Sequence, residues 1–208
     1  MPAKENLFIE NYINLTKKEL YLIERYLQIL QEWNKKINLT AIKDKEDIII
    51  KHIIDSLSVL NHVDISGNMA DIGSGGGFPG IPIKIKLPSI HMTLIEANRK
   101  RANFLKYAVR TLGIEGLEVY HGRVEDYDKK DFFDCAISRA FSNILNFCSV
   151  SAPLVKQGGL IIAMTGREKP LDAKQFKALG CDIHTIVSFE LPNHKGYRTL
   201  VVFKKCFT

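Results

Sequence analysis

Cysteine is scarce in this chain of 208 residues, which contains only four. None belongs to a Cys-x-x-Cys pair and no histidine tract lies beside them, so zinc-ribbon and thioredoxin-like proteins have no support and no metal site is indicated. Three of the four lie in apolar surroundings, which predicts reduced thiols in the core of a cytosolic protein. The four are Cys135, Cys148, Cys181 and Cys206.

Long apolar runs are also missing. A membrane-spanning helix needs roughly 18 or more apolar residues in succession, and no stretch approaches that length. The first ten residues carry Lys4, Glu5 and Glu10 and no apolar run, unlike a signal peptide. We therefore expect a cytoplasmic protein that does not associate with membranes.

A strong charge imbalance is absent as well. The formal net charge is +6, and apolar residues make up 46% of the chain. This composition predicts a folded protein with one full core, and the length fits one domain. The basic excess permits an anionic partner such as nucleic acid, but it fits a basic soluble enzyme with a solvated surface equally well.

Helical patterns dominate residues 1–65, and no strand-like alternation appears before Met69. Thr16 and Glu19 form a capping box ahead of an apolar helical series, and Asp44 starts a second helix over residues 45–61. We therefore expect these residues to form a helical cap on a core of residues 66–208, together making one domain. The apolar series consists of Leu20, Ile23, Leu27, Leu30, Trp33 and Ile37.

Strand and helix patterns alternate after residue 68, which predicts an α/β fold with a mostly parallel sheet. Two strand-like runs at the end, 183–191 and 198–203, are joined by six residues and so predict an antiparallel hairpin. This ending is typical of Rossmann-like class I methyltransferases. The other expected strands are 68–72, 91–96, 117–121, 133–138 and 160–164, and the expected helices are 99–112 and 144–155.

The first strand runs into the loop Asp71-Ile72-Gly73-Ser74-Gly75-Gly76-Gly77-Phe78-Pro79-Gly80. Its G-x-G-x-x-G pattern is weak evidence alone, because a tight structural turn before a helix starting near Pro79 explains it too. Asp71 discriminates between cofactors: a dinucleotide pyrophosphate does not favour a carboxylate here, whereas the cationic amino group of S-adenosylmethionine does. The loop therefore favours S-adenosylmethionine.

Two further acidic positions follow neighbouring strands. Glu96, about twenty residues past the loop, is placed to accept hydrogen bonds from ribose hydroxyls, which fits NAD and S-adenosylmethionine equally. The segment Gly122-Arg123-Val124-Glu125-Asp126 follows the third strand, where loops can meet an adenine edge. Glu125 and Asp126 are equally explained as solvated charges.

The residues after the fourth strand, Ser138-Arg139-Ala140-Phe141, narrow the methyl acceptor. They lack the Asn/Asp-Pro-Pro-aromatic sequence of enzymes that methylate exocyclic amino groups of bases. Enzymes that methylate C5 of pyrimidines need a nucleophilic cysteine, usually after Pro or Thr, and no cysteine of this chain follows either residue. An atom that is already nucleophilic, such as guanine N7, remains. Its methylation needs positioning rather than a general base. We assign no catalytic residue; Arg139 is the nearest candidate, unless it only bridges to a surface carboxylate.

Basic residues form a stripe on the helix after the second strand. Such a stripe can follow RNA phosphates, although a solvated helix face is the commoner explanation. The stripe contains Arg99, Lys100, Arg101, Lys106 and Arg110, and we expect Lys84, Lys86 and Arg123 nearby.

Several motifs along nearly the whole chain resemble the bacterial small-subunit rRNA guanine-N7 methyltransferases, the glucose-inhibited division protein B family (GidB, RsmG). They are Trp33-Asn34-Lys35-Lys36-Ile37-Asn38-Leu39-Thr40, His52-Ile53-Ile54-Asp55-Ser56, the glycine loop through Ile81-Pro82, Lys100-Arg101-Ala102-Asn103-Phe104-Leu105, and Ser138-Arg139-Ala140-Phe141. The resemblance implies N7 methylation of a guanine in 16S rRNA, near the ribosomal decoding site. It implies 16S rRNA or the small ribosomal subunit as partner.

The resemblance also implies roles for single residues. Gly73 and Phe78 would line the cofactor pocket, Val124 and Glu125 would meet the adenine, and Arg139 would complete the site. An N-terminal signature would lie beside the site mouth: Asn38, Thr40, His52, Asp55 and Ser56. The expected cofactor-binding residues are thus Asp71, Gly73, Ser74, Gly75, Gly77, Phe78, Glu96, Val124, Glu125 and Arg139.

The chain departs from the family pattern at two places, Thr165-Gly166 for Lys-Gly and Tyr197-Arg198-Thr199 for Glu-Arg-His. If the missing lysine contacts RNA, one contact is lost unless Arg167 or Lys169 substitutes. Two other hypotheses stay open: an NAD-dependent oxidoreductase using the same loop, and a non-catalytic ribosome-binding protein with a relic methyltransferase fold. We take a monomer as the default.

Overall fold

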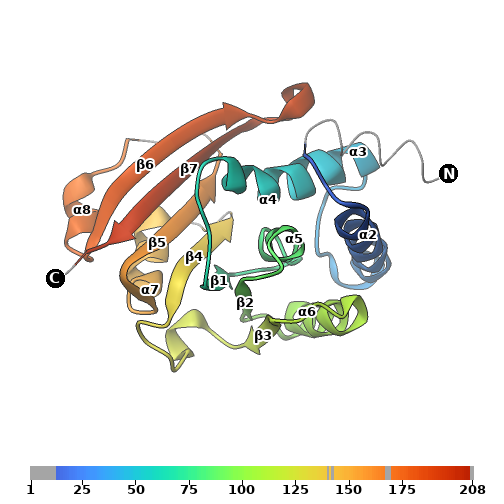
Figure 1. Ribbon diagram of the computed structural model, residues 1–208, viewed down its shortest axis with the longest axis horizontal. Coiled ribbons are helices and arrows are strands. Elements are labelled where there is room, and N and C mark those ends of the chain that lie inside the picture. Colours follow the sequence, from blue (N-terminus) through green and yellow to red (C-terminus); the bar gives the residue numbers. More distant parts are fainter. Residues whose placement is uncertain (1–12, 140, 142, 167–169, 207–208) are drawn as a thin grey trace.

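The computed structural model describes residues 13–139, 141, 143–166 and 170–206 (Figure 1). Its centre is a seven-stranded sheet in the order β3-β2-β1-β4-β5-β7-β6. The strands from β3 to β5 are parallel, and β7 runs antiparallel to both β5 and β6. The strands are β1 (Asn68–Ile72), β2 (His91–Glu96), β3 (Leu117–His121), β4 (Phe133–Arg139), β5 (Val155–Thr165), β6 (Cys181–Glu190) and β7 (Tyr197–Lys205).

This architecture confirms the expected α/β fold with a mostly parallel sheet and a C-terminal antiparallel hairpin. Several boundaries differ from those expected. The helix expected over 144–155 ends at Ser151, and β5 begins at Val155 rather than 160. β6 begins at Cys181 rather than 183, and β7 ends at Lys205 rather than 203. Pro153 explains the early end of the helix, because proline cannot donate the backbone hydrogen bond that continues a helix.

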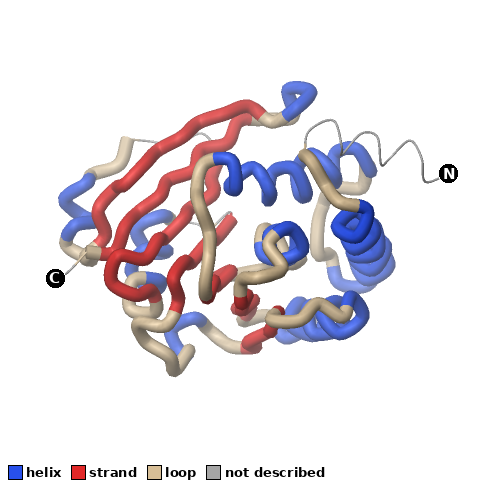
Figure 2. The backbone as a smooth tube through the Cα atoms, in the orientation of Figure 1, coloured by secondary structure: helices blue, strands red, loops and turns tan. Residues whose placement is uncertain are grey.

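Helices cover both faces of the sheet (Figure 2). Because alternate strand residues point to opposite faces, the sheet contributes to two cores: Met69 and Ile137 join one, Ala70 and Ala136 the other. The first core includes residues of α2 (Lys17–Ile37), the helical run 45–61, α5 (Gly80–Lys86) and α6 (Arg99–Leu112); the second includes residues of η3 (Val124–Asp126), α7 (Ile144–Ser151) and α8 (Ala173–Lys177).

The helix α2 forms as its sequence predicts. Thr16 accepts from the backbone of Glu19 while the Glu19 carboxylate accepts from Thr16, which completes the capping box. Trp33 then packs on α6, with its ring 5.8 Å from Phe104 and 5.3 Å from Tyr107. The described part of the chain contains no helix both long and apolar enough to cross a membrane.

The helix expected over 45–61 has those ends but is not a uniform α-helix. It consists of α3 (Lys45–Ile48), the π-helical segment η1 (Ile49–Ile54), α4 (Asp55–Ser58) and the 3-10 turn η2 (Val59–Asn61). π-helical segments are rare and are frequent at functional sites. Here the segment carries His52 and ends beside Asp55, two residues that lie at the candidate site.

Candidate cofactor and substrate site

The candidate site lies where the carboxyl ends of the parallel strands meet. β1 pairs with β2 on one side and with β4 on the other, so the strand order reverses beside β1. Ligands of open α/β sheets bind in the crevice outside such a switch point. Asp71, Glu96 and Arg139 belong to the ends of these three strands, so the fold brings the three predicted residues to one edge.

The glycine loop is tied to the neighbouring strand. The amides of Gly73 and Ser74 donate to the carbonyl of Ile95, at 2.9 and 3.2 Å, and the Ser74 hydroxyl donates to the Asp71 carbonyl at 2.8 Å. Gly73 has a φ of +74°, and a Cβ added there would meet no atom within 4 Å. This position therefore needs glycine for its conformation and presents bare backbone to open space, as a ligand cradle requires.

Asp71 is fully buried beneath the loop. Its Oδ2 accepts a hydrogen bond of 2.9 Å from the Gly80 amide, whereas Oδ1 has no partner among the described residues. Burial raises the pKa of this carboxyl to about 7. A buried carboxylate oxygen without a partner is costly, and a cation brought to it would lower that pKa and stabilise the charge.

Glu96 is buried at the end of β2 and fixes two loops. Its Oε2 accepts from the Gly75 amide at 2.8 Å, and its Oε1 accepts from the Asn98 amide at 2.7 Å. Each carboxylate oxygen has a second lone pair, so these bonds leave room for two hydroxyl donors. The ribose contact expected of Glu96 stays a prediction.

The segment after β3 forms the short helix η3, in which Val124 is buried and Glu125 is exposed. The Gly122 amide donates to the Glu96 carbonyl at 3.1 Å, which holds this loop beside the end of β2. Val124 belongs to the same core cluster as Ile72 and Ile95. The loop is thus positioned for the adenine contact that the family resemblance implies, which also stays a prediction.

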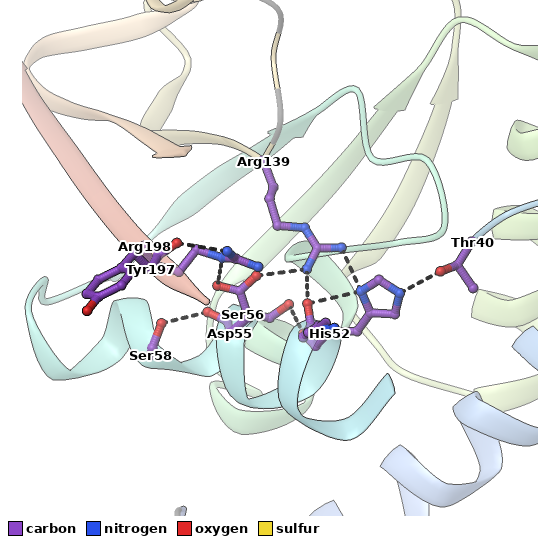
Figure 3. A network of polar contacts seen from close by, with 9 residues as sticks. Thr40, His52, Asp55, Ser56, Ser58, Arg139, Tyr197 and Arg198 are labelled. Atoms are coloured by element: carbon purple, nitrogen blue, oxygen red, sulfur yellow. Dashed lines mark hydrogen bonds and ion pairs between the residues drawn. The ribbon is translucent and has the colours of Figure 1, made fainter. Parts of the chain in front are cut away.

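Arg139 points from the end of β4 to the π-helical segment (Figure 3). Its Nη1 donates to the Lys51 carbonyl at 2.8 Å and lies 3.2 Å from Oδ2 of Asp55. Asp55 is fully buried, and its Oδ1 accepts from Nε of Arg198 at 2.9 Å. The alternative of a surface carboxylate for Arg139 is therefore wrong, since its acidic partner is buried between two guanidinium groups.

The π-helical geometry makes the Lys51 carbonyl available. In an α-helix the Asp55 amide would donate to Lys51, but here it donates to His52 and Ile50. The carbonyl of Lys51 accepts from Arg139 instead. The π-helical segment thus leaves free the carbonyl that Arg139 binds, next to the ion pair of Arg139 with Asp55.

His52 links this network to the loop after α2. Its Nε2 lies 2.8 Å from the Thr40 hydroxyl, and its Nδ1 lies 3.1 Å from Nη2 of Arg139 (Figure 3). Nδ1 also lies 3.1 Å from the carbonyl oxygen of Lys51, so this nitrogen contacts both a guanidinium donor and a backbone acceptor. Burial, together with the nearby charge of Arg139, lowers the pKa of His52 to about 3. The ring is neutral and stacks on Phe78, with centroids 4.4 Å apart.

Four residues of the expected N-terminal signature thus lie together with Arg139 beside the glycine loop, namely Thr40, His52, Asp55 and Ser56, whereas Asn38 is exposed at the end of α2. Phe78 contacts both sides of the network, because the Arg139 guanidinium carbon is 5.1 Å from its ring centre. Ala140 falls outside the described residues.

The expectation for the basic stripe was partly wrong. Arg99, Lys100, Arg101, Lys106 and Arg110 are exposed on α6, but Lys84 is buried and donates to the carbonyls of Pro88 and Ile90. Lys86 donates to the Asn14 carbonyl and pairs with Glu19, on the side of α2. An amphipathic pattern places lysines outside, and it cannot show that backbone carbonyls will draw one inward.

Two residues of the site were missed. Tyr26 is fully buried and donates to the Gly76 carbonyl of the loop. Its place on the apolar face of α2 was the available signal, because a buried tyrosine needs a partner for its hydroxyl. For Arg198 the signal was its match to the arginine of the family's Glu-Arg-His pattern; its partner Asp55 lies 143 residues earlier and could not be read from the sequence.

The two departures from the family pattern are neighbours in space. Thr165 and Thr199 are register partners on β5 and β7. Thr199 is buried, and its hydroxyl lies 3.0 Å from that of Ser188. Arg167 and Lys169, named above as substitutes for the missing lysine, lie outside the described residues.

Known proteins resemble this chain in sequence along most of its length. The family model "rRNA small subunit methyltransferase G" (GidB) matches residues 19–201. The chain belongs to this family. Relatives named ribosomal RNA small subunit methyltransferase G include one from Caldanaerobacter subterraneus, 41% identical over 88% of this chain and 80% of the relative. Another, from a Geobacter species, is 40% identical over 91% of this chain and 90% of the relative.

Solved structures share the fold of this rRNA small subunit methyltransferase G family member. A SAM-dependent methyltransferase from Aquifex aeolicus has a TM-score of 0.60 at 15% identity, covering 85% of this chain and 98% of that one. Geranyl diphosphate C-methyltransferase from Streptomyces coelicolor has a TM-score of 0.59 at 11% sequence identity, and the match covers 87% of this chain and 98% of that one. The family and fold expected from the sequence are confirmed, and so is the enzyme class, a methyltransferase.

Proposed function

We propose that this protein transfers a methyl group from S-adenosylmethionine to N7 of a guanine in 16S rRNA, near the ribosomal decoding site. Family membership supports a methyltransferase of small-subunit rRNA. We also propose that residues 1–65 form a cap on a core of residues 66–208, and that the protein acts as a cytoplasmic monomer.

The residues of the site fit S-adenosylmethionine. When bound, it supplies an electrophilic methyl group on a sulfonium. The unpartnered Oδ1 of Asp71 suits its cationic amino group, and the bare backbone at Gly73 leaves space beside the loop. Glu96 has free lone pairs for the ribose hydroxyls. These features support Asp71, Gly73, Ser74, Gly75, Gly77, Phe78, Glu96, Val124, Glu125 and Arg139 as the binding set.

The observation that supports guanine N7 as the methyl acceptor is that the polar side chains beside the glycine loop already have hydrogen-bond or ion-pair partners. His52 is neutral and both its ring nitrogens are engaged. Asp55 lies between two arginines, and a guanidinium cannot accept a proton. Among the described residues, these groups offer no general base. Guanine N7 has a free lone pair and no proton to lose, so positioning alone suffices.

A pH profile tests this observation. At saturating S-adenosylmethionine and RNA, the single-turnover rate of methyl transfer is expected to stay constant, within about twofold, from pH 6.5 to 9, because the bound cation keeps Asp71 ionised and no protein group must take a proton from guanine N7. A rate that rises about tenfold per pH unit through part of this range would reveal a general base and overturn the choice of N7.

Two other functions raised from the sequence alone do not agree with the family shown above, and they predict different results. An NAD-dependent oxidoreductase would bind NAD, and calorimetric titration with NAD and S-adenosylmethionine separates the two cofactors; Asp71 favours the second. A non-catalytic ribosome-binding protein would bind the small subunit without turnover. The intact loop with its Asp71 and Glu96 contacts favours a working enzyme.

A further inference from the structure

A groove on the helical cap adjoins the site described above and shares Thr40 with it. It has a volume of about 830 Å³, within the range of roughly 300–1,000 Å³ that ligand pockets span. The end of α2, the loop that follows it and the start of α3 form its walls. We call it the lysine groove, and its polar lining residues are Gln31, Asn34, Lys35, Asn38, Thr40, Lys43 and Lys45.

The charged side chains that line the lysine groove have one sign. Three lysines line it, and its lining contains no Asp or Glu. Lys35 and Lys43 are exposed and form no ion pair within the part of the chain that the structure describes. The carboxylates next to it in the chain have partners of their own: Asp44 accepts from the Asp47 amide, Glu46 accepts from Asn193, and Asp47 pairs with Lys51 and Lys195, each at 2.7 Å. The ammonium groups of Lys35 and Lys43 are therefore available to an anion.

The wall of the groove is held in a fixed shape. The Asn34 side chain donates to the Thr40 carbonyl and accepts from the Thr40 amide, both at 2.9 Å. The Thr40 hydroxyl in turn accepts from the Ile42 amide at 3.1 Å. A side chain that replaces backbone pairing in this way pre-organises the loop, which reduces the entropy lost when a ligand binds.

The groove leads to the candidate site by two contacts. Thr40 lines it and lies 2.8 Å from Nε2 of His52 (Figure 3), whose ring stacks on Phe78. Leu30, which also lines the groove, lies 3.6 Å from the position of a Cβ on Gly76. A strand of RNA whose target nucleotide enters the site can therefore continue along the groove.

We propose that the lysine groove binds the phosphate backbone of the rRNA segment that flanks the methylated nucleotide. This inference rests on the proposed function, because it assumes an RNA substrate. Phosphodiesters match a lining of lysine ammonium and asparagine amide groups, and phosphate contacts fix the register of a nucleic acid without reading its sequence.

The test measures the binding of protein-free 16S rRNA and of small ribosomal subunits by filter retention at several salt concentrations. The variant Lys35→Ala/Lys43→Ala is expected to bind free rRNA about tenfold or more weakly, with a salt slope smaller by about 1 to 2. Its affinity for S-adenosylmethionine, measured by calorimetry, should not change. Lys35→Arg/Lys43→Arg should restore RNA binding, since arginine also contacts phosphate.

The matched control is Lys174→Ala/Lys177→Ala, which removes the same charge from exposed positions on α8, at the other end of the molecule (Figure 1). It should alter binding less than twofold. A second variant, Ala41→Trp, obstructs the groove at an exposed position without changing charge, and it should also weaken RNA binding.

Each other outcome identifies which proposal fails. Equal effects of both lysine pairs, or no effect of the groove pair, would overturn the groove. An effect on subunits but not on free rRNA would assign the groove to a ribosomal protein instead. RNA binding that depends on Lys35 and Lys43 in a protein that methylates no acceptor would sustain the groove and overturn the proposed function. Wild-type protein that binds neither RNA nor subunits would contradict both.

Discussion

Replacing Asp55 by alanine is expected to lower the free energy of unfolding by about 3–5 kcal/mol, the usual effect of removing one partner from a buried ion pair. Asp55 is fully buried and lies 3.2 Å from Nη1 of Arg139 and 2.9 Å from Nε of Arg198. Without it, two largely buried guanidinium groups face each other uncompensated. Urea unfolding monitored by circular dichroism measures the change.

Two comparisons show whether charge causes the loss. Asp64→Ala removes an exposed carboxylate from the loop between η2 and β1. It should change the free energy of unfolding by less than about 0.5 kcal/mol. Adding Arg198→Met to Asp55→Ala should recover about 1 kcal/mol or more, because one unpaired charge is removed as well. A further loss in the double variant would mean that Arg198 contributes through packing and not through its pair with Asp55.

Replacing Asp71 by asparagine is expected to weaken the binding of S-adenosylmethionine by about 10- to 100-fold, since a charged hydrogen bond contributes roughly 1.5–3 kcal/mol. The pH dependence is equally informative. The free carboxyl has a pKa of about 7, so below pH 7 a proton must leave before the carboxylate can pair with an amino group. Wild-type affinity should therefore fall below pH 7, and that of the variant should stay level.

The same substitution should stabilise the protein without ligand. A folded-state pKa raised above the ordinary value of 3.8 means that stability falls as pH rises from about 3.8 to about 7, because over this range the unfolded chain has released the proton that the folded chain still holds. Asp71→Asn removes this loss and should increase the free energy of unfolding by about 1–2 kcal/mol at pH 8. Asp64→Asn is the control. Unchanged affinity in Asp71→Asn would remove this carboxylate from the cofactor site.

Regular elements were predictable wherever local chemistry marks both ends. Helix α6 lies at residues 99–112 as expected, because Asn98 caps its first amides and Gly113 ends it in the left-handed conformation. Strands β1 and β2 also have the expected ends, 68–72 and 91–96, and this placed Asp71 and Glu96 at their carboxyl ends. The chain order of the strands also predicted the hairpin of β6 and β7.

The parts that escaped prediction depend on residues far apart in the chain. The apolar series over 45–61 shows a helix, but only the Arg139 side chain, arriving from β4, explains why the Lys51 carbonyl stays free of the helix. Asp55 pairs with residues 84 and 143 positions later, and no local pattern encodes such partners. The sequence therefore predicted where the glycine loop, Asp71 and Glu96 lie in the fold, but it predicted the network beside them only as unconnected motif residues.

The most direct test of the proposed chemistry is the identity of the methylated nucleoside. Purified protein would be incubated with methyl-labelled S-adenosylmethionine and with small ribosomal subunits that lack the modification, their free rRNA, or a tRNA control, and the RNA digested to nucleosides. We expect the label in 7-methylguanosine from 16S rRNA and none in tRNA. Label in any other nucleoside, or in no acceptor although S-adenosylmethionine binds, would contradict guanine-N7 methylation of small-subunit rRNA.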